Sequence, residues 1–217
     1  MYKTVVFDLD GTLLNTLTDL ANAGNRLCRK YGWPTHERQA YRYFVGNGIP
    51  KLVERLAPAD QRTPAVLEAA LADFKRDYGQ HLRDTTAPYP GIPEMLAKLK
   101  ANGVQLAVFS NKADALAKEV VKDYFGTQYF TIVRGQMPGV APKPAAEGTN
   151  ALLQALHADP ASTLYVGDSN VDVETAHNAN LPCCGAVWGF RTREELNAAG
   201  AEYLAENSDE LYDVIMK

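Results

Sequence analysis

The sequence predicts an α/β fold in which a block of helices is inserted after the first strand. Two observations indicate this architecture. From Pro93 onward, short apolar runs alternate with stretches of helical periodicity, and such alternation is typical of a parallel sheet with helices on both faces. Between about Leu17 and Arg83, the periodicity is helical throughout.

The elements follow from local patterns. Residues 5–7 are β-branched or aromatic and the run breaks off at Asp8, which predicts a short buried strand. In the inserted block we expect helices over 17–31, 37–44, a short stretch from 50, and 64–83. Beyond it we expect strands over 104–109, 131–133, 163–166 and 185–188, with 203–204 as a short edge strand. The helices between them are expected over 93–100, 113–124, 145–156, 171–178, 193–198 and 209–216.

This order of elements predicts two domains. We expect residues 1–15 and 86–217 to form the α/β core, and residues 16–85 to form an all-helical cap inserted after the first strand. Ligands of open parallel sheets bind outside the carboxyl ends of the strands. Both junctions of the insert would lie near the carboxyl end of the first strand, so the cap would cover such a site.

The composition argues against several classes of protein. With 217 residues, 46% of them hydrophobic, the chain can bury a substantial core. A formal net charge of -4, without a cluster of Lys and Arg, argues against a nucleic-acid partner. The 3 cysteines suit neither a disulfide framework nor a zinc site and favour a reducing cytoplasm. No signal-peptide pattern or apolar run of the ~20 residues needed to cross a bilayer is visible, so no membrane partner is expected.

Asp8 and Asp10 are the first candidate functional residues. Two positions apart in an extended chain, their side chains leave the same side, and Gly11 permits the turn that follows. Such a pair is stable when a cation lies between the carboxylates or one of them holds a proton. A solvated turn at a strand end is the alternative for this stretch alone. A calcium-binding EF-hand loop is excluded, because it requires glycine at its sixth position and glutamate at its twelfth.

Two later predicted strands also end in polar residues. Because the carboxyl ends of parallel strands share one edge, these residues should converge, and Asp172 joins them if a helix begins near Asp168. The residues expected at this edge are Asp8, Asp10, Ser110, Asn111, Asp168 and Asp172. Several carboxylates in one cleft require a hard divalent cation, and oxygen ligands favour Mg²⁺ over Zn²⁺.

Ser110 and Lys143 each have two interpretations. Ser110 lies outside a Gly-x-Ser-x-Gly elbow, so we expect a hydrogen-bond donor and not a nucleophile, with a plain helix cap as the alternative. Lys143 stands between two prolines that stiffen its loop, which allows an aimed positive charge. A solvated surface lysine is the alternative.

Together these residues resemble the haloacid dehalogenase superfamily of phosphotransferases. The resemblance covers all four motifs of that family, in order along the whole chain. It implies the haloacid dehalogenase fold, a Rossmann-like parallel sheet with a cap. The motifs are Asp8-Leu9-Asp10-Gly11-Thr12, Phe109-Ser110-Asn111, Lys143-Pro144, and Gly167-Asp168-Ser169 with Asp172.

The resemblance also implies a role for each residue. Asp8 would attack the phosphoryl group and become a phosphoaspartate, while Asp10 would act as general acid and then as general base. Mg²⁺ would be held by Asp8, the backbone carbonyl of Asp10 and Asp168. The other roles are phosphate binding by Ser110 and Asn111, charge neutralisation by Lys143, and support of the metal site by Thr12 and Asp172.

A narrower resemblance, to bacterial phosphoglycolate phosphatases, lies in residues 45–55 and 188–193. It implies 2-phosphoglycolate as the substrate. Its carboxylate needs a cation or N–H donors, and the candidates in the cap are Gly46, Asn47, Gly48 and Lys51. A solvated helix charge is the alternative for Lys51.

Other functions stay open from the sequence. Within the family they are a phosphatase for pyrophosphate, nucleotides or sugar phosphates, or a phosphomutase. The resemblance disfavours a dehalogenase, because such enzymes lack the second acidic residue that Asp10 supplies. A phosphoacceptor signalling module would also place aspartates at strand ends, but it needs no inserted lid. The expected partner is a small-molecule phosphate ester, and monomer or homodimer is unresolved.

Overall fold

The computed structural model describes all 217 residues, and the backbone contacts divide the chain into two compact units. Unit 1 comprises Met1–Asn15 and Pro88–Lys217, and unit 2 comprises Thr16–Ala87. The chain passes between the units at two short paired strands, β2 (Leu14–Asn15) and β3 (Ala87–Pro88).

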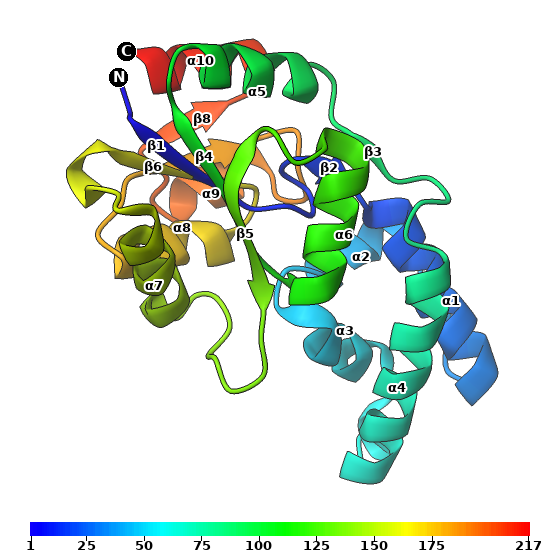
Figure 1. Cartoon of the computed structure of the whole chain (residues 1–217). Coiled ribbons are helices and arrows are strands. Elements are labelled where there is room, and N and C mark those ends of the chain that lie inside the picture. The colour runs from blue at the N-terminus through cyan, green and yellow to red at the C-terminus, as the bar shows by residue number, and fades with distance from the viewer. The chain divides into compact units, whose positions relative to one another are not determined.

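Unit 1 is built on a six-stranded parallel sheet (Figure 1), which confirms the predicted α/β fold class. Its order is β5-β4-β1-β6-β7-β8, so the first strand lies in the interior of the sheet. The strands are β1 (Thr4–Phe7), β4 (Gln105–Ala113), β5 (Phe130–Gln136), β6 (Thr163–Gly167), β7 (Cys183–Ala186) and β8 (Tyr203–Ala205).

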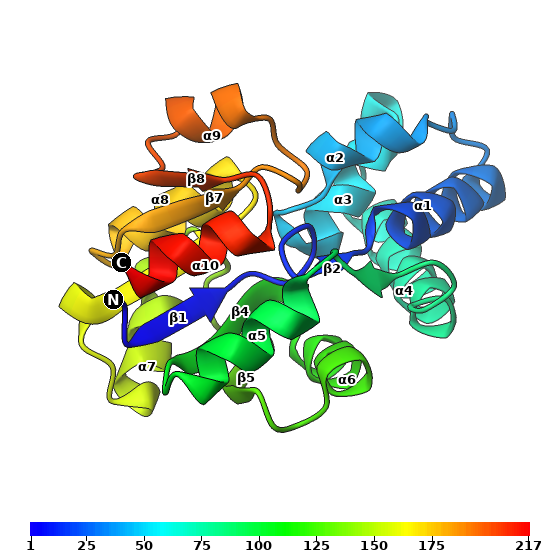
Figure 2. The ribbon, with the colours of Figure 1, turned by 90° about the horizontal axis from the view of Figure 1, so that it is seen from above.

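Helices cover both faces of this sheet. Figures 1 and 2 show α5 (Ile92–Ala101) and α10 (Ser208–Met216) side by side on one face. On the opposite face lie α7 (Ala146–Leu156) and α8 (Asn170–Asn178), which contact each other. The remaining helices pack beside outer strands: α6 (Asp114–Phe125) against β4 and β5, and α9 (Arg193–Ala198) against β7 and β8. Burial on both faces explains why the central strands are apolar along their whole length.

Three strands differ from their predicted bounds by more than one residue, among them β5, which ends at Gln136 and not at the expected position 133. β4 continues four residues past its predicted end, because Ala113 still pairs with Gln136 of β5. β7 begins and ends two residues earlier than predicted, so the strand expected over 185–188 is present but its bounds are wrong. The reason is that Trp188 leaves the ladder: its indole N–H donates to the backbone carbonyl of Thr12, 3.0 Å away.

Unit 2 consists of helices, as its periodicity predicts. They are α1 (Leu17–Tyr31), α2 (Tyr41–Phe44), α3 (Gly48–Leu56) and α4 (Pro64–Gln80), with 3₁₀ turns at Arg38–Ala40 and Ala59–Gln61. The predicted helix over 37–44 is confirmed only over residues 41–44, as α2, because residues 38–40 form a 3₁₀ turn. α4 starts where Thr63 accepts a hydrogen bond from the Val66 N–H, and its Phe74 and Tyr78 are fully buried.

Asp19 joins the two ends of unit 2. It lies in the first turn of α1, is 1% exposed, and accepts hydrogen bonds from the backbone N–H and the hydroxyl of both Thr85 and Thr86 at 2.6–3.1 Å. Burial alone would raise the pKa of Asp19, but these hydrogen bonds lower it below its ordinary value. The ionised carboxylate therefore stabilises the fold.

We expect Asp19→Asn to lower the free energy of unfolding by about 2–3 kcal/mol at neutral pH. The reason is that the N–H and hydroxyl donors of Thr85 and Thr86 lose their anionic acceptor. A carboxyl group with a lowered folded pKa stabilises above its unfolded pKa of about 3.9 and loses this effect as the pH falls through the folded value. Urea unfolding of both proteins at several pH values should show the difference narrowing below about pH 4. Asp60→Asn, at an exposed position, is the control; an equal effect of the two substitutions would refute the role of Asp19.

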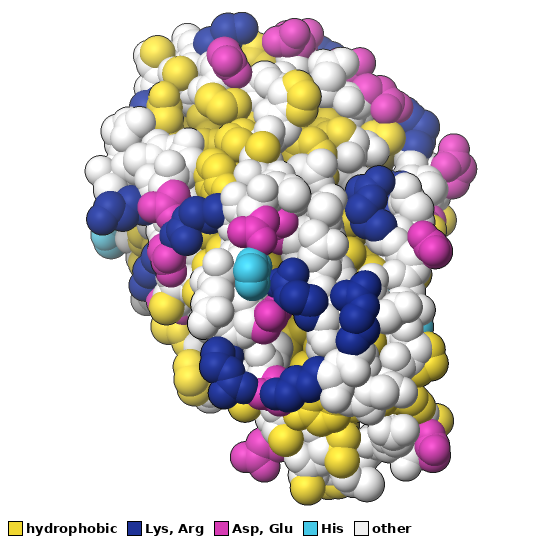
Figure 3. All heavy atoms as spheres, turned by 90° about the vertical axis from the view of Figure 1, so that its right-hand side faces the viewer, with side chains coloured by type: hydrophobic (Ala, Val, Ile, Leu, Met, Phe, Trp, Pro, Cys, Tyr) yellow, Lys and Arg dark blue, Asp and Glu magenta, His cyan; other side chains and the backbone are white.

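The surface of the chain carries mixed charge. Figure 3 shows Lys and Arg side chains interleaved with Asp and Glu across the face it presents, so neither sign forms a broad field there. Among the helices, none combines the length and the apolar character needed to cross a membrane.

Candidate functional site

Three neighbouring strands bring polar side chains to one edge of the sheet. β1 pairs with β4 on one side and with β6 on the other. Asp8 follows the end of β1, Ser110 lies near the carboxyl end of β4, and Asp168 follows the end of β6. All three residues are at most 7% exposed. The site therefore lies at the edge where ligands of parallel sheets bind.

One lysine lies among the carboxylates at this edge. One carboxylate oxygen from each of Asp8, Asp168 and Asp172 lies within 4.8 Å of the others. The ammonium nitrogen of Lys143 is 2.9 Å from Asp8 Oδ1 and 2.7 Å from Asp172 Oδ1, and its side chain is 2% exposed. The structure thus excludes the alternative of a solvated surface lysine.

The loop around Lys143 is fixed by its neighbours. Asn111 Oδ1 accepts a hydrogen bond from the Lys143 N–H at 2.8 Å, and Asn111 Nδ2 donates to the Lys143 carbonyl at 3.2 Å. The ammonium group also lies 3.2 Å from the Tyr165 hydroxyl and 3.4 Å from the Phe109 carbonyl. The side chain of Asn111 therefore positions Lys143, and its contact with phosphate stays a prediction.

Asp172 holds the loop that precedes α8. Its Oδ2 accepts hydrogen bonds from the Asp168 N–H at 3.2 Å, the Ser169 N–H at 3.1 Å and the Ser169 hydroxyl at 2.7 Å. Its Oδ1 faces Lys143. Both oxygens are thus engaged, so Asp172 suits a supporting role better than that of a metal ligand.

Asp168 is held from two sides. Its Oδ1 accepts a hydrogen bond from the Thr12 hydroxyl at 3.1 Å, and its Oδ2 accepts one from the Phe190 N–H at 2.7 Å. Gly11 and Gly189 pack directly against it, because a Cβ on either would lie 2.3 Å or 2.2 Å from its side chain. No sequence pattern indicates the Phe190 donor, because Phe190 lies beyond the strand expected over 185–188.

The charges of the site shift its pKa values. Burial raises the pKa of Asp8 to about 6, with Asp172 and Asp10 adding to the effect and Lys143 opposing it. Burial and the charges of Asp172 and Asp8 raise the pKa of Asp168 well above its usual range. Burial by itself would lower the pKa of Lys143, but Asp172 and Asp8 raise it well above the ordinary value. Negative charge is therefore in excess, and a further cation would be stabilised here.

The residues present fit a hard divalent cation. Asp8 Oδ1 is buried and accepts no hydrogen bond, because the Lys143 ammonium is close to it without hydrogen-bond geometry. Asp168 accepts one hydrogen bond on each oxygen, which leaves a lone pair on both. When all four carboxyl groups of residues 8, 10, 168 and 172 are ionised, they face two ammonium groups, so two negative charges would be uncompensated. Oxygen donors and this charge suit Mg²⁺.

The second ammonium group belongs to Lys112, which was not among the predicted site residues. Its nitrogen lies 3.0 Å from Asp10 Oδ1 and 3.4 Å from Oδ2. The alternation of side chains along a strand could have indicated this residue, because Lys112 lies two positions after Ser110 and side chains two apart in a strand share a face. That signal was hidden by the predicted end of the strand at Phe109.

The remaining predicted site residues lie in unit 2. Gly48 begins α3, Asn47 precedes it, and Gly46 and Gly48 have φ values of 112° and 81° that favour glycine. The ammonium of Lys51 lies 2.8 Å from both carboxylate oxygens of Glu54 at the surface. Arg55 donates to the Asn47 side chain and to the carbonyls of residues 43 and 44, which fixes the loop before α3.

Comparison with known proteins identifies related chains. A model of the family described as haloacid dehalogenase-like hydrolase matches residues 5–186. A phosphoglycolate phosphatase from Chromobacterium violaceum is 31% identical over 216 residues, covering 98% of this chain and 96% of the relative. Another from Thiobacillus denitrificans is 32% identical over 199 residues, covering 87% and 84%. A crystal structure from Lactobacillus delbrueckii subsp. bulgaricus, of a provisionally named phosphoglycolate phosphatase, has a TM-score of 0.93 at 28% identity and covers 99% of this chain and 98% of that one.

Proposed function

The chain belongs to the haloacid dehalogenase-like hydrolase family and is a phosphatase of that family. From this premise we propose that it hydrolyses a small phosphate monoester through a phosphoaspartate at Asp8. The observation that carries the proposal is the group formed by Asp8, Lys143, Asp168 and Asp172 at the carboxyl edge of the sheet. An anionic nucleophile approaches a phosphate dianion only where cations offset their repulsion.

Each residue then has one task. An Asp8 oxygen forms a bond to phosphorus as the bond to the leaving oxygen breaks, and Asp10 supplies the proton that this oxygen takes. Asp10 next accepts a proton from water, whose oxygen attacks the same phosphorus atom and releases inorganic phosphate and free Asp8. Lys143, held by Asn111 and Asp172, neutralises the nucleophile and the phosphate throughout.

The proposed cofactor is Mg²⁺. Asp8, Asp168 and the backbone carbonyl of Asp10 would hold it, and Thr12 and Asp172 would support these ligands. When bound, the ion supplies the positive charge that stabilises the transferring phosphoryl group. Thr12 already orients Asp168 through its hydroxyl, which supports this assignment.

We propose 2-phosphoglycolate as the substrate, because the relatives that match nearly the whole chain are named for that activity. We also propose that unit 2 acts as the cap and that its loop at Gly46–Gly48 takes part in substrate choice. The first turn of α3 offers backbone N–H groups that suit a carboxylate. Lys51 and Arg55 are engaged with Glu54 and with the loop itself, which favours the backbone as the donor.

The test is an assay of the purified chain with Mg²⁺ against 2-phosphoglycolate, pyrophosphate, a nucleotide and sugar phosphates. We expect phosphate release that EDTA abolishes and added Mg²⁺ restores, with the highest kcat/KM for 2-phosphoglycolate. Preference for another ester would refute 2-phosphoglycolate as the substrate, but the proposed phosphatase reaction would still hold. No release from any ester, together with a phosphoprotein that persists for minutes, would instead indicate a signalling module.

A further inference from the structure

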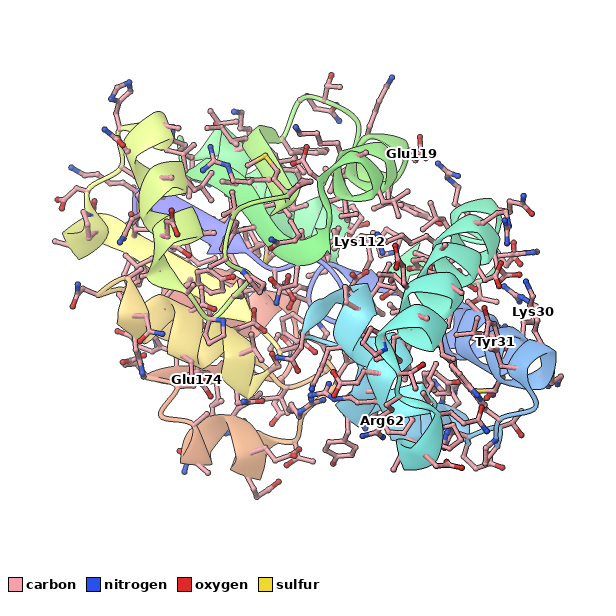
Figure 4. The ribbon with its side chains drawn as sticks, turned by 90° about the horizontal axis from the view of Figure 1, so that it is seen from below. Lys30, Tyr31, Arg62, Lys112, Glu119 and Glu174 are labelled. Carbon is pink, nitrogen blue, oxygen red and sulfur yellow. The ribbon has the colours of Figure 1, made fainter.

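Lys112 forms a largely buried ion pair with Asp10. Its ammonium nitrogen contacts both carboxylate oxygens, at 3.0 Å and 3.4 Å, and its side chain is only 2% exposed, against 14% for Asp10. The residue projects from the end of β4, where Figure 4 labels it. Its own N–H lies 3.3 Å from the Ser110 hydroxyl oxygen, which ties its backbone to the same strand end.

The two lysines of the site contact different aspartates. Lys143 contacts Asp8 and Asp172, while Lys112 contacts Asp10. An ammonium group is costly to bury, and a well-packed apolar side chain is often as stabilising as a buried ion pair. Stability alone is therefore a weak reason for a lysine at position 112.

We propose that Lys112 is the positioning residue for Asp10. The inference rests on the proposed function, since it concerns the carboxyl group that gives a proton to the leaving oxygen and later takes one from water. By donating a hydrogen bond to Oδ1, the nearer oxygen, the Lys112 ammonium fixes the rotation of the carboxyl group. Oδ2, which accepts only the longer hydrogen bond at 3.4 Å, is then the oxygen that carries the transferred proton. Lys112 itself neither gives up nor takes a proton in this step.

A fixed general acid matters most when the leaving group is poor. An alkoxide leaving group needs a proton as the bond to phosphorus breaks, whereas p-nitrophenolate leaves readily without one. The ratio of kcat/KM for the two kinds of ester therefore reports on the acid step, because kcat/KM includes only steps up to release of the first product. Loss of stability would lower both values together.

The experiment measures kcat/KM of Lys112→Met with the best alkyl phosphate of the substrate panel and with p-nitrophenyl phosphate. We expect about a 10–100-fold loss for the alkyl ester, since a misplaced reacting group can cost about that much, and less than about a 3-fold loss for the aryl ester. Lys118→Met is the matched control, because Lys118 is 57% exposed and pairs with Asp114 on α6. Equal losses for both esters, or no loss, would overturn the proposal.

A double variant keeps the proposal testable if Lys112→Met does not fold. Asp10→Asn with Lys112→Met removes both charges of the buried pair, so neither is left unpaired. If Lys112 acts through Asp10, this double variant should have the kcat/KM of Asp10→Asn alone. A further loss of about 10-fold would show a separate action of Lys112 on the substrate and would refute the inference.

The activity of the wild-type enzyme distinguishes a failure of the proposed function from a failure of the role of Lys112. If it hydrolyses no phosphate monoester, the proposed function fails. If it is active and Asp10→Asn cripples it, while Lys112→Met shows no difference between the alkyl and aryl esters, only the role of Lys112 fails.

Discussion

Asp8→Asn is expected to lower kcat by about 10⁴-fold or more, because an amide cannot form the covalent bond to phosphorus that the proposed reaction requires. The substitution nearly preserves shape, and burial raises the pKa of Asp8 to about 6, so its charge is disfavoured in the folded state. An Asp whose folded pKa is raised costs stability above its unfolded pKa. We therefore expect the variant to unfold at an equal or slightly higher urea concentration than the wild type.

Steady-state phosphate release and urea unfolding, measured on the same preparation, check this prediction. Asp60→Asn makes the same chemical change at an exposed position and should leave both quantities unaltered. Retention of more than about 1% of the wild-type rate would exclude Asp8 as the nucleophile, because an enzyme without its nucleophile cannot keep that much activity.

Lys143→Met is expected to damage both activity and stability. The ammonium lies between Asp8 and Asp172 in a site that is almost fully buried, so its removal leaves carboxylates without compensation. Breaking a buried ion pair in this way costs about 3–5 kcal/mol of unfolding free energy. Loss of one group that stabilises the transferring phosphate should lower kcat/KM by about 10²–10³-fold.

The two variants therefore differ in a measurable way. Asp8→Asn should be inactive and stable, whereas Lys143→Met should be nearly inactive and unstable, with part of the stability restored by Mg²⁺ binding to the uncompensated carboxylates. Lys118→Met serves as the control for losing an ion-paired but exposed lysine. A Lys143→Met enzyme as stable as the wild type would contradict the charge balance described for the site.

The convergence of the site could be read from the sequence because parallel strands end at one edge. Asp8 and Asp168 each follow a short run of buried residues, and the structure places them beside each other. Lys143 was distinguished from a surface lysine by the prolines around it together with the family resemblance. Its actual partners, Asp8 and Asp172, lie far from it in the chain and became visible only in the fold.

Other parts of the site lacked a sequence signal. Lys112 sits in Ser-Asn-Lys, residues of low strand propensity, and only pairing of Ala113 with Gln136 of β5 extends the strand that far. The Phe190 N–H reaches Asp168 because the chain turns away from the sheet at Trp188. Both effects depend on tertiary contacts that local periodicity does not encode.

Within unit 2, the sequence predicted α1, α3 and α4 as helices, but it did not predict the division of residues 38–44. α4 has a capping threonine, a proline in its first turn and a stripe of buried side chains, so its start could be predicted from the sequence. Between α1 and α3, Tyr41 is fully buried, and Gly24 leaves room for its ring. This packing divides residues 38–44 into a 3₁₀ turn and one short helix, which an amphipathic pattern alone would not show.

The central claim is that Asp8 accepts the phosphoryl group. The Asp10→Asn variant should hold this intermediate, since p-nitrophenyl phosphate can phosphorylate Asp8 without a general acid while the later hydrolysis lacks its base. Incubation with Mg²⁺ and this ester, reduction with borohydride and peptide mass spectrometry locate the acyl phosphate. We predict conversion of Asp8, and no other residue, to homoserine; reduction at another aspartate, or at none, would contradict the account.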